Sequence, residues 1–370
     1  MRQLTNMEIK KNNRNRIFRY ISTKEITSNP DIAYELKMSL PTVTQNTKEL
    51  LEKGLIEEKG DLNSTGGRRA KGLAIVKDLK FAVGIDITRN HLGIVLLNLA
   101  KEIISYERLP LIFENNEKYY LRVNNIIENI FSKYSIEREK ILGIGISLPG
   151  IVNLKNETIT ESHVLNLKNI SLKEIKNYFS YPCIFMNDAN AGAYAEGINN
   201  RKNERFFYLS LSNTVGGAIF SQKDLILGEN YRCGEVGHMT INLNGDKCYC
   251  GKKGCLDVYC SAKKLESSGK LETFFLKLKN NDKKALKIWE EYIKYLVIAL
   301  KNIHMLLDCK IVIGGYVGGY IEKYISDIWE KILDEDIFEN SCFISASNYK
   351  MESSALGAAL SIVESFIIEI

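Results

Sequence analysis

The sequence predicts an α/β protein with a small helical module at its N-terminus, and three observations support this fold class. Past residue 77, short apolar strands alternate with helical stretches, which is typical of an α/β architecture. Residues 1–77 instead contain three short helical patterns and then a strand with a Gly- and Ser-containing tip. A dense group of metal-ligand residues lies in the C-terminal half of the chain.

The metal-ligand residues predict a structural zinc ion. One imidazole and three thiolates complete a tetrahedral shell and leave no position for a water molecule. Two glycines among the cysteines let the backbone turn tightly enough for the sulfurs to reach one ion. The alternative is a group of ordinary buried thiols, although the chain has only four histidines to place beside them by chance. The predicted ligands are His238, Cys248, Cys250 and Cys255.

Length and composition indicate a globular protein with more than one domain. The chain has 370 residues, 45% apolar and 26% charged, which are ordinary values for a soluble protein of two or three domains. Residues 1–6 are followed by charges, and no apolar run is long enough to cross a bilayer. Eight cysteines without a regular framework fit a reducing compartment. We therefore expect a cytoplasmic protein with no membrane partner.

Positive charge is concentrated in the first fifth of the chain. Residues 1–77 hold 15 Lys and Arg against 9 Asp and Glu, whereas the remainder holds 35 against 36. A basic module joined to a neutral body favours contact with a polyanion such as nucleic acid. A solvated, Lys-rich surface is the alternative that charge alone leaves open.

The pattern within this module strengthens the nucleic-acid interpretation. Residues 16–21 have helical apolar spacing, and residues 29–31 provide the start of a second helix. Ser39 can cap a third helix, and Pro41 suits its first turn. Residues 54–59 then indicate a turn into a strand. This order predicts a winged helix–turn–helix, and a small protein-interaction module is the alternative.

The third helix is the expected recognition element. One of its faces repeats apolar and small residues that we expect to be buried, namely Leu40, Val43, Thr47 and Leu50. The other face carries polar side chains that can reach base edges and phosphates in a major groove. The residues expected there are Thr42, Gln45, Asn46 and Lys48. The predicted partner is therefore double-stranded operator DNA.

The predicted wing ends in a Gly-Gly pair followed by Arg68 and Arg69. The glycines give a thin backbone, and the two guanidinium groups suit the negative potential of a narrow, A·T-rich minor groove. We therefore expect both arginines to contact DNA. A flexible basic linker to the next domain is the alternative, and the two roles are compatible.

The remainder of the chain predicts two α/β lobes. Apolar strands are expected near residues 82–87, 92–99, 141–147, 206–211 and 311–315. Because the strand sets divide near residue 190, we place the lobes at 78–190 and 191–370, after a DNA-binding domain and linker at 1–77. The C-terminal helix is expected to return to the first lobe. A cleft between two lobes is a common position for a ligand.

The order of motifs resembles the ROK family (repressors, open reading frames and sugar kinases) over essentially the whole chain. The motifs that carry the resemblance lie at 84–87, 145–150, 187–191, 234–238, 248–255 and 313–315. The resemblance implies a bilobal, actin-like sugar-kinase (ribonuclease H-like) ATPase fold, in a homodimer or homotetramer. The N-terminal winged helix is similar to the repressor branch of the family, which includes xylose repressors and N-acetylglucosamine regulators.

The resemblance also implies a sugar site. Asn187 and Asp188 match the pair that grips sugar hydroxyls, and in the kinases this Asp is the catalytic base. Glu235 and His238 match two further contacts, and Gly150 matches a backbone contact. In addition, Asp257 stands where the family usually has Glu, so its carboxylate is one methylene shorter. A zinc ion that fixes His238 also fixes which ring nitrogen faces the sugar.

The phosphate loops differ from those of the family's kinases. The first loop of the kinases is Asp-x-Gly-Gly-Thr-Lys, but residues 86–91 here keep only the Asp. The second loop, at residues 211–216, lacks two early glycines, whereas the adenosine-side segment at 313–318 is retained. Because phosphoryl transfer depends on positioning and charge stabilisation, we expect no catalysis and regard Asp188 as a vestigial base.

Three functional hypotheses follow. The first is a sugar-responsive transcriptional repressor of carbohydrate-utilisation genes, without catalysis, whose effector is xylose or a related sugar. Its dimer would place two recognition helices one duplex turn, roughly 34 Å, apart. The second is a ROK-type sugar kinase that uses ATP and carries an accessory DNA-binding domain. The third is a scaffold that binds a transporter protein instead of a free sugar.

Overall fold

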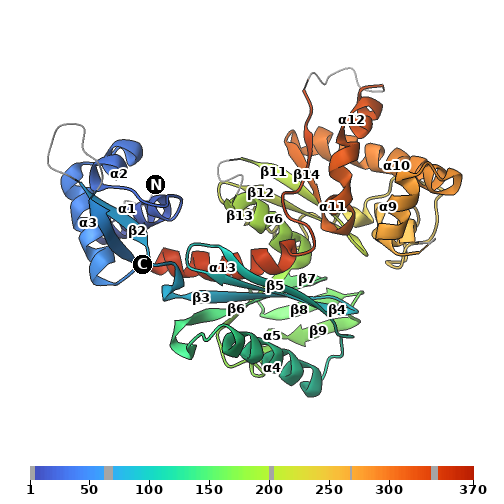
Figure 1. The fold of residues 1–370 in the computed structure, drawn as a ribbon. Coiled ribbons are helices and arrows are strands. Elements are labelled where there is room, and N and C mark those ends of the chain that lie inside the picture. Colours follow the sequence, from blue (N-terminus) through green and yellow to red (C-terminus); the bar gives the residue numbers. More distant parts are fainter. Residues whose placement is uncertain (1–4, 62–69, 200–203, 267–268, 335–340) are drawn as a thin grey trace.

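The computed structural model describes residues 5–61, 70–199, 204–266, 269–334 and 341–370. A small module stands at one end of the molecule, and two α/β lobes lie beside it (Figure 1). The predicted fold class is confirmed, because a helix–turn–helix with a two-stranded wing precedes two lobes that each hold a five-stranded sheet.

The module begins with the helices α1 (Asn6–Ile21), α2 (Asn29–Leu36) and α3 (Leu40–Glu52). The antiparallel strands β1 (Ile56–Asp61) and β2 (Lys71–Ile75) form the wing. Thr5, Ser28 and Ser39 cap the three helices by accepting backbone N–H groups, which explains why each helix starts where it does. The three residues that join α2 to α3 leave room only for a tight turn, as a helix–turn–helix requires.

The first lobe is built on a sheet with the strand order β10-β6-β3-β4-β5. Its strands are β3 (Phe81–Ile87), β4 (His91–Asn98), β5 (Ile103–Pro110), β6 (Ile141–Leu148) and β10 (Cys183–Asn187). A second, three-stranded sheet contains β7 (Ile151–Asn153), β8 (Thr158–Ser162) and β9 (Leu167–Ser171). The helices α4 (Glu117–Lys133) and α5 (Leu172–Lys176) lie together on one side of the lobe, and α13 (Ser353–Glu369) lies on the opposite face of the large sheet (Figure 1).

The second lobe repeats this topology with the strand order β13-β12-β11-β14-β15. Its strands are β11 (Phe206–Leu211), β12 (Val215–Ser221), β13 (Asp224–Ile226), β14 (Lys310–Gly314) and β15 (Ile344–Ala346). In both sheets an antiparallel three-strand meander is extended by two parallel strands. This shared arrangement is the actin-like fold that the family resemblance implied.

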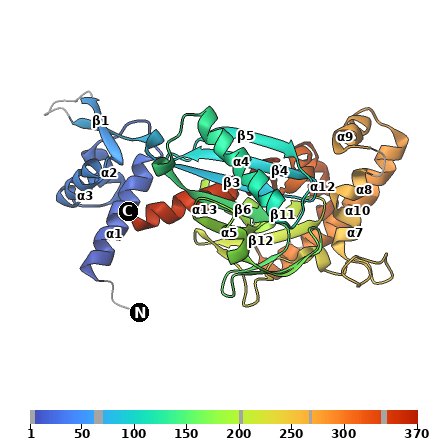
Figure 2. The same ribbon diagram turned by 90° about the horizontal axis from the view of Figure 1, so that it is seen from below.

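Helices cover both faces of the second sheet. The helix α6 (Asp188–Asn199) packs on the face that is turned toward the first lobe. The opposite side holds α7 (Leu256–Cys260), α8 (Ala262–Leu265), α9 (Leu271–Lys279), α10 (Lys283–Leu307), α11 (Gly315–Ile321) and α12 (Ile325–Leu333). Viewed from below, the two lobes lie at one end of the molecule and the winged module lies at the other, with α13 reaching toward it (Figure 2).

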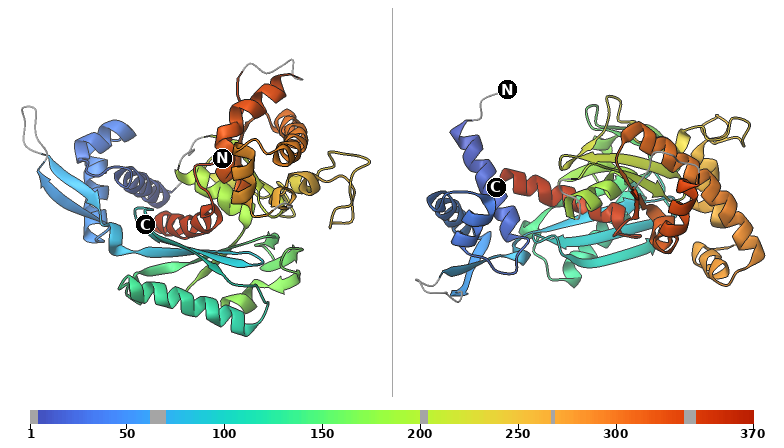
Figure 3. Two further views of the ribbon diagram at one scale, coloured as in Figure 1. Left: turned by 45° about the vertical axis from the view of Figure 1, so that its right-hand side comes forward. Right: turned by 90° about the horizontal axis from the view of Figure 1, so that it is seen from above.

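The C-terminal helix α13 packs in direct contact with both lobes. A Cβ atom at Gly84 in β3 would lie 1.8 Å from the carbonyl oxygen of Ala355, and one at Gly357 would lie 1.7 Å from that of Ala191 in α6. Both positions therefore require glycine, because any side chain would force α13 away from its neighbours. Figure 3 shows α13 between the sheet of the first lobe and the second lobe.

The far end of α13 enters the core of the winged module. Its last turns contribute apolar side chains to the cluster formed by the module's own helices and wing. The members include Ile17, Phe18, Ile21, Val43 and Leu50 from the module and Val363, Ile367 and Ile370 from the C-terminus. The module is thus held to the body by a continuous hydrophobic core as well as by the chain connection.

Candidate functional site

A cavity of about 410 Å³ lies between the two lobes. The strand β10 ends and α6 begins at its floor, which places Asn187 and Asp188 side by side. The Asn187 side-chain amide donates to the carbonyl of Gly150 at 2.9 Å, and the Asp188 carboxylate accepts the Ala189 N–H at 2.9 Å. The volume is within the range of small-molecule sites.

Five of the six residues expected to contact a sugar line this cavity. They are Gly150, Asn187, Asp188, Glu235 and His238. They come from the turn after β6, the junction of β10 and α6, and the segment around the short 3₁₀ helix Val236–His238. The fold therefore gathers residues that are far apart in the sequence into one space between the lobes.

Asp257, the sixth residue expected to contact a sugar, is not among the residues that line the cavity. It lies in α7 behind the cavity, where it is 6% exposed. Its carboxylate accepts the backbone N–H of Val215 at 2.6 Å. Because α7 directs this short side chain at the start of β12, Asp257 supports the cavity wall rather than facing the cavity.

Carboxyl groups dominate the electrostatics of the cleft. Burial raises the pKa of Asp188. Burial, and then the nearby charge of Asp188, raise the pKa of Glu235 and bring that of Asp86, at the end of β3, to about 7. Crowded carboxyl groups with raised pKa values hold protons more readily, so they can donate as well as accept hydrogen bonds to a polyol.

The four predicted metal ligands come together at the edge of the cavity. Their ligand atoms all lie within 4.8 Å of one another. The Cys250 and Cys255 sulfurs are 3.7 Å apart, and the Cys248 sulfur is 3.8 Å from Nδ1 of His238. Sulfurs bound to a tetrahedral zinc ion at about 2.3 Å lie about 3.8 Å from one another, so the donor set fits this ion. Gly251 has a φ of 92°, which allows the tight turn between the cysteines.

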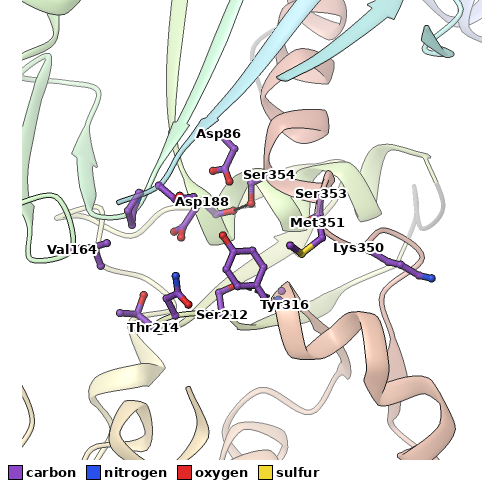
Figure 4. A pocket seen from close by; sticks show the side chains of 14 residues that line it. Asp86, Val164, Asp188, Ser212, Thr214, Tyr316, Lys350, Met351, Ser353 and Ser354 are labelled. Atoms are coloured by element: carbon purple, nitrogen blue, oxygen red, sulfur yellow. Dashed lines mark hydrogen bonds between the residues drawn. The ribbon is translucent and has the colours of Figure 1, made fainter. Parts of the chain in front are cut away.

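A second, much smaller cavity of about 40 Å³ adjoins the first (Figure 4). Asp188 lines both cavities, and Asp86, Ser212 and Tyr316 line the smaller one. Figure 4 shows the Tyr316 side chain pointing from α11 toward the two aspartates. This space is far smaller than the usual volume of a small-molecule site, about 300 Å³ or more.

Two hydroxyl groups beside the smaller cavity accept backbone N–H groups. The Thr88 hydroxyl accepts the His91 N–H at 3.0 Å in the turn between β3 and β4. The Ser212 hydroxyl, after β11, accepts the Tyr316 N–H at 3.3 Å. The first bond therefore lies within one turn, and the second joins the end of β11 to α11.

The exposed face of α3 differs in part from the prediction. Gln45 and Lys48 are exposed and Thr42 is half-buried, as a recognition face allows. Asn46 is only 2% exposed, because its amide folds back and donates to the carbonyl of Thr42 at 2.8 Å. The expectation that Asn46 shares this face is therefore wrong.

Two further observations revise the predicted DNA-binding surface. Leu40, expected to be buried, is 48% exposed because it lies at the first turn of α3, and Thr44 is exposed beside Gln45. Arg68 and Arg69 fall outside the residues that the structure describes. The polar side chains that α3 exposes at least in part on the predicted recognition face are therefore Thr42, Thr44, Gln45 and Lys48.

The sequence reasoning missed several residues that line the larger cavity. They are Glu161, His163, Arg232, Tyr249 and Lys252. Tyr249 and Lys252 had a local signal, because each lies between two predicted metal ligands. Within the described parts of the chain, no helix combines the length and apolarity that a bilayer crossing demands.

Comparison with known proteins agrees with this geometry. The sequence pattern of the ROK family matches residues 82–364, and that of a winged helix-turn-helix DNA-binding domain matches residues 11–57. The xylose repressor of Caldicellulosiruptor bescii is 34% identical over 263 residues, which cover 70% of this chain and 66%, just under two thirds, of that protein. The xylose repressor of Bacillus subtilis is 29% identical, with 80% of this chain and 79% of that protein covered.

Solved structures show the same fold. A ROK family transcriptional regulator, described as a homologue of the Escherichia coli MLC protein, superposes with a TM-score of 0.78 at 23% identity and covers 98% of this chain and all of its own. A ROK family glucokinase from Streptomyces griseus, in complex with glucose and AMPPNP, gives a TM-score of 0.63 at 18% identity over 76% of this chain and 98% of its own. Since the family pattern matches well over half of the chain, the protein belongs to the ROK family.

Proposed function

We propose that this protein is a sugar-responsive transcriptional repressor that binds operator DNA without catalysing a reaction, with xylose or a related sugar as effector. The observation that carries the proposal is the course of α13. One end of this helix bonds to Asp188 in the cavity, and the other end lies in the core of the winged module. The names of the related xylose repressors support the same assignment.

Operator binding is assigned to α3. Gln45 and Thr44 present hydrogen-bonding groups at an exposed helix face, and Lys48 is placed to meet a phosphate. The excess positive charge of residues 1–77 strengthens attraction to DNA. A homodimer or homotetramer would present two such helices to half-sites about 34 Å apart. Binding to chromosomal DNA would place the protein in the cytoplasm.

The sugar would act by changing the position of α13. The helix is wedged between β3 and α6, so a closure of the lobes around a ligand must move it or strain it. Its far end belongs to the module core, so the same displacement reorients the recognition helix. The sugar shifts the equilibrium only to the extent that it binds the open and closed conformations unequally.

A structural zinc ion would be held by His238, Cys248, Cys250 and Cys255. The ion would neutralise the thiolates and hold the loop between the 3₁₀ helix Val236–His238 and α7 at the cavity edge. With Nδ1 turned to the cysteines, the other ring nitrogen of His238 faces the cavity. The metal-ligand cluster thus fixes the orientation of a predicted sugar contact.

A sugar kinase is the second candidate, and one observation favours it. Asp188 lies where the larger and the smaller cavity meet, which is the position that a base between sugar and phosphate donor requires. Against it, the smaller cavity of about 40 Å³ has no room for a nucleotide, and the hydroxyls of Thr88 and Ser212 beside it already accept the N–H groups of His91 and Tyr316. Sustained ADP release that Asp188→Asn abolishes would support the kinase.

The proposal is tested by footprinting on the DNA upstream of the protein's own gene, with and without a panel of pentoses and hexoses. The proposal expects a protected site that one sugar releases. Calorimetric titration of the same panel identifies which sugar binds. Absence of protection under every condition would overturn the assignment.

A further inference from the structure

Tyr249 occupies an unusual position at the edge of the larger cavity. It lies between Cys248 and Cys250 in the metal-ligand loop, yet its own side chain lines the cavity. Its hydroxyl is 3.4 Å from Nε2 of His238, the ring nitrogen that faces away from the cysteines. The tyrosine therefore caps the histidine atom that would otherwise be available to a ligand.

The chemistry of this contact follows from the other ring nitrogen. Nδ1 of His238 is directed at the sulfur of Cys248, so Nδ1 is the atom available to a metal. A neutral imidazole that uses one nitrogen as a ligand carries its proton on the other. Nε2 is then a donor, and the Tyr249 hydroxyl accepts from it. A sugar hydroxyl is an acceptor of the same kind and would compete for the same N–H.

The same tyrosine also crosses the cleft. Its ring lies 5.2 Å from that of His163, which follows β8 in the first lobe, whereas Tyr249 belongs to the second lobe. It also lies edge-to-face with the His238 ring at 5.3 Å. Tyr249 is 49% exposed, so its hydroxyl can turn to water without a further change in the core.

We propose that the Tyr249 hydroxyl holds the place of a sugar hydroxyl. It bonds to Nε2 of His238 in the ligand-free protein, and the sugar hydroxyl replaces it there when the sugar binds. This inference rests on the proposed sugar site. It assigns Tyr249 a role in setting the affinity for the sugar and in breaking a contact between the second lobe and His163 of the first lobe. Displacement of the tyrosine breaks the contact with His163, so this edge of the first lobe is free to move as the lobes close around the ligand.

The test is calorimetric titration of the metal-loaded full-length chain with the sugar panel, in the unaltered protein and in Tyr249→Phe. The variant keeps the ring and its packing but removes the competing acceptor. Since a long, neutral hydrogen bond contributes little net energy, the variant should bind the effector sugar about threefold more tightly. Zinc content per chain, measured by mass spectrometry, should be unchanged.

Tyr231→Phe is the matched control. The Tyr231 hydroxyl accepts the N–H of Lys155, so it also joins the lobes, but Tyr231 does not line the cavity. Its loss should leave the sugar Kd unchanged. This control separates competition at His238 from a general loosening of the cleft.

Three results would overturn the inference. Weaker binding by Tyr249→Phe would show that the hydroxyl contacts the bound sugar, and an unchanged Kd would show that it does not compete. Equal tightening in Tyr231→Phe would assign the effect to the lobes in general. If the unaltered, metal-loaded chain binds no sugar, the proposed function itself fails and this inference falls with it.

Discussion

The Ser354 hydroxyl, at the start of α13, donates to the backbone carbonyl of Asp188 at a distance of 3.1 Å. This bond ties the helix to the floor of the larger cavity. Further along the same helix, Glu364 pairs with Arg19 of the winged module and with Lys101 of the first lobe. One helix of 17 residues, about 26 Å long, therefore contacts both the cavity and the DNA-binding module.

Removing the Ser354 hydroxyl should weaken communication between the sites. We expect Ser354→Ala to lower the coupling free energy between sugar and operator by about 1 kcal/mol, because one hydrogen bond to Asp188 is lost. The measurement is the ratio of operator Kd values with and without sugar. Ser365→Ala is the control, since that hydroxyl bonds only within α13, to the Ser361 carbonyl at 2.8 Å. An equal loss in both variants would contradict this role.

Loss of the Glu364 charge should loosen the winged module. Glu364 is 3% exposed and pairs with two partly buried cations, so Glu364→Gln leaves both without their counter-charge and should lower the free energy of unfolding by about 2 kcal/mol, less than for a fully buried pair. Denaturant titration measures this change. Glu369→Gln is the control on the same helix, because Glu369 pairs with Lys11 at 3.2 Å on the surface, where ion pairs contribute about 1 kcal/mol or less.

The same carboxyl predicts a pH dependence. Burial alone would raise the pKa of Glu364, but Lys101 and then Arg19 outweigh it and hold this pKa below its usual value. A lowered folded-state pKa means that the contribution is present above the unfolded-state pKa and is lost as the pH falls through the folded value. The stability difference between the unaltered chain and Glu364→Gln should therefore disappear in acid. A stability difference that persists below the folded-state pKa of Glu364 would refute this pH dependence.

Asp86 should show the opposite dependence. Burial, and then Asp188, raise its pKa from 3.8 to about 7, so the folded state binds its proton more tightly than the unfolded state does. Stability should fall as the pH rises from about 4 to about 7, because ionisation of this buried group opposes folding. Asp86→Asn should therefore be stabilising at pH 8 and nearly neutral below pH 4. Thermal denaturation at both pH values checks this, and an equal effect at both would count against it.

The cysteine cluster should hold one zinc ion for each chain. Cys250→Ser removes one ligand, so it should reduce zinc content and melting temperature together and weaken sugar binding through His238. Cys342→Ser is the control, because Cys342 is exposed and lies outside the cluster. Metal analysis and thermal denaturation provide the readouts. Full sugar affinity in a zinc-free variant would contradict the role of the cluster.

Exposed and buried residues of α3 should behave differently in operator binding. Gln45→Ala should weaken specific binding by about 1–3 kcal/mol while leaving stability unchanged, because its side chain is exposed. Lys48→Ala should reduce the slope of log affinity against log salt concentration by about 1, because one phosphate contact is lost. Asn46→Ala should instead lower stability, because Asn46 is buried and bonds to the Thr42 carbonyl. Fluorescence anisotropy and denaturant titration distinguish the two classes of effect.

Local patterns predicted the fold and the metal-ligand cluster well. Caps such as Ser39 and the short spacing of the cysteines act over a few residues, so the sequence carries them directly. The recognition helix was harder to predict. The helical period predicted a buried Leu40 and an exposed Asn46, and the structure shows the reverse. Leu40 lies beyond the module core, and the Asn46 amide bonds back along its own helix.

The individual side-chain contacts between distant segments could not be predicted. The direction of the Asp257 carboxylate depends on how α7 packs against β12, which residue identity does not encode. The pairing of Tyr249 with His163 depends on how the two lobes face each other. The link from Asp188 through α13 to the winged module likewise exists only once the C-terminus has returned to the first lobe.

Operator affinity measured against sugar concentration tests the central claim most directly. The account predicts that a sugar which binds the unaltered chain weakens its operator binding, and that Asp188→Asn, folded and still bound to DNA, no longer responds. A bound sugar that leaves operator affinity unchanged, or an Asp188→Asn variant that responds like the unaltered chain, would contradict it.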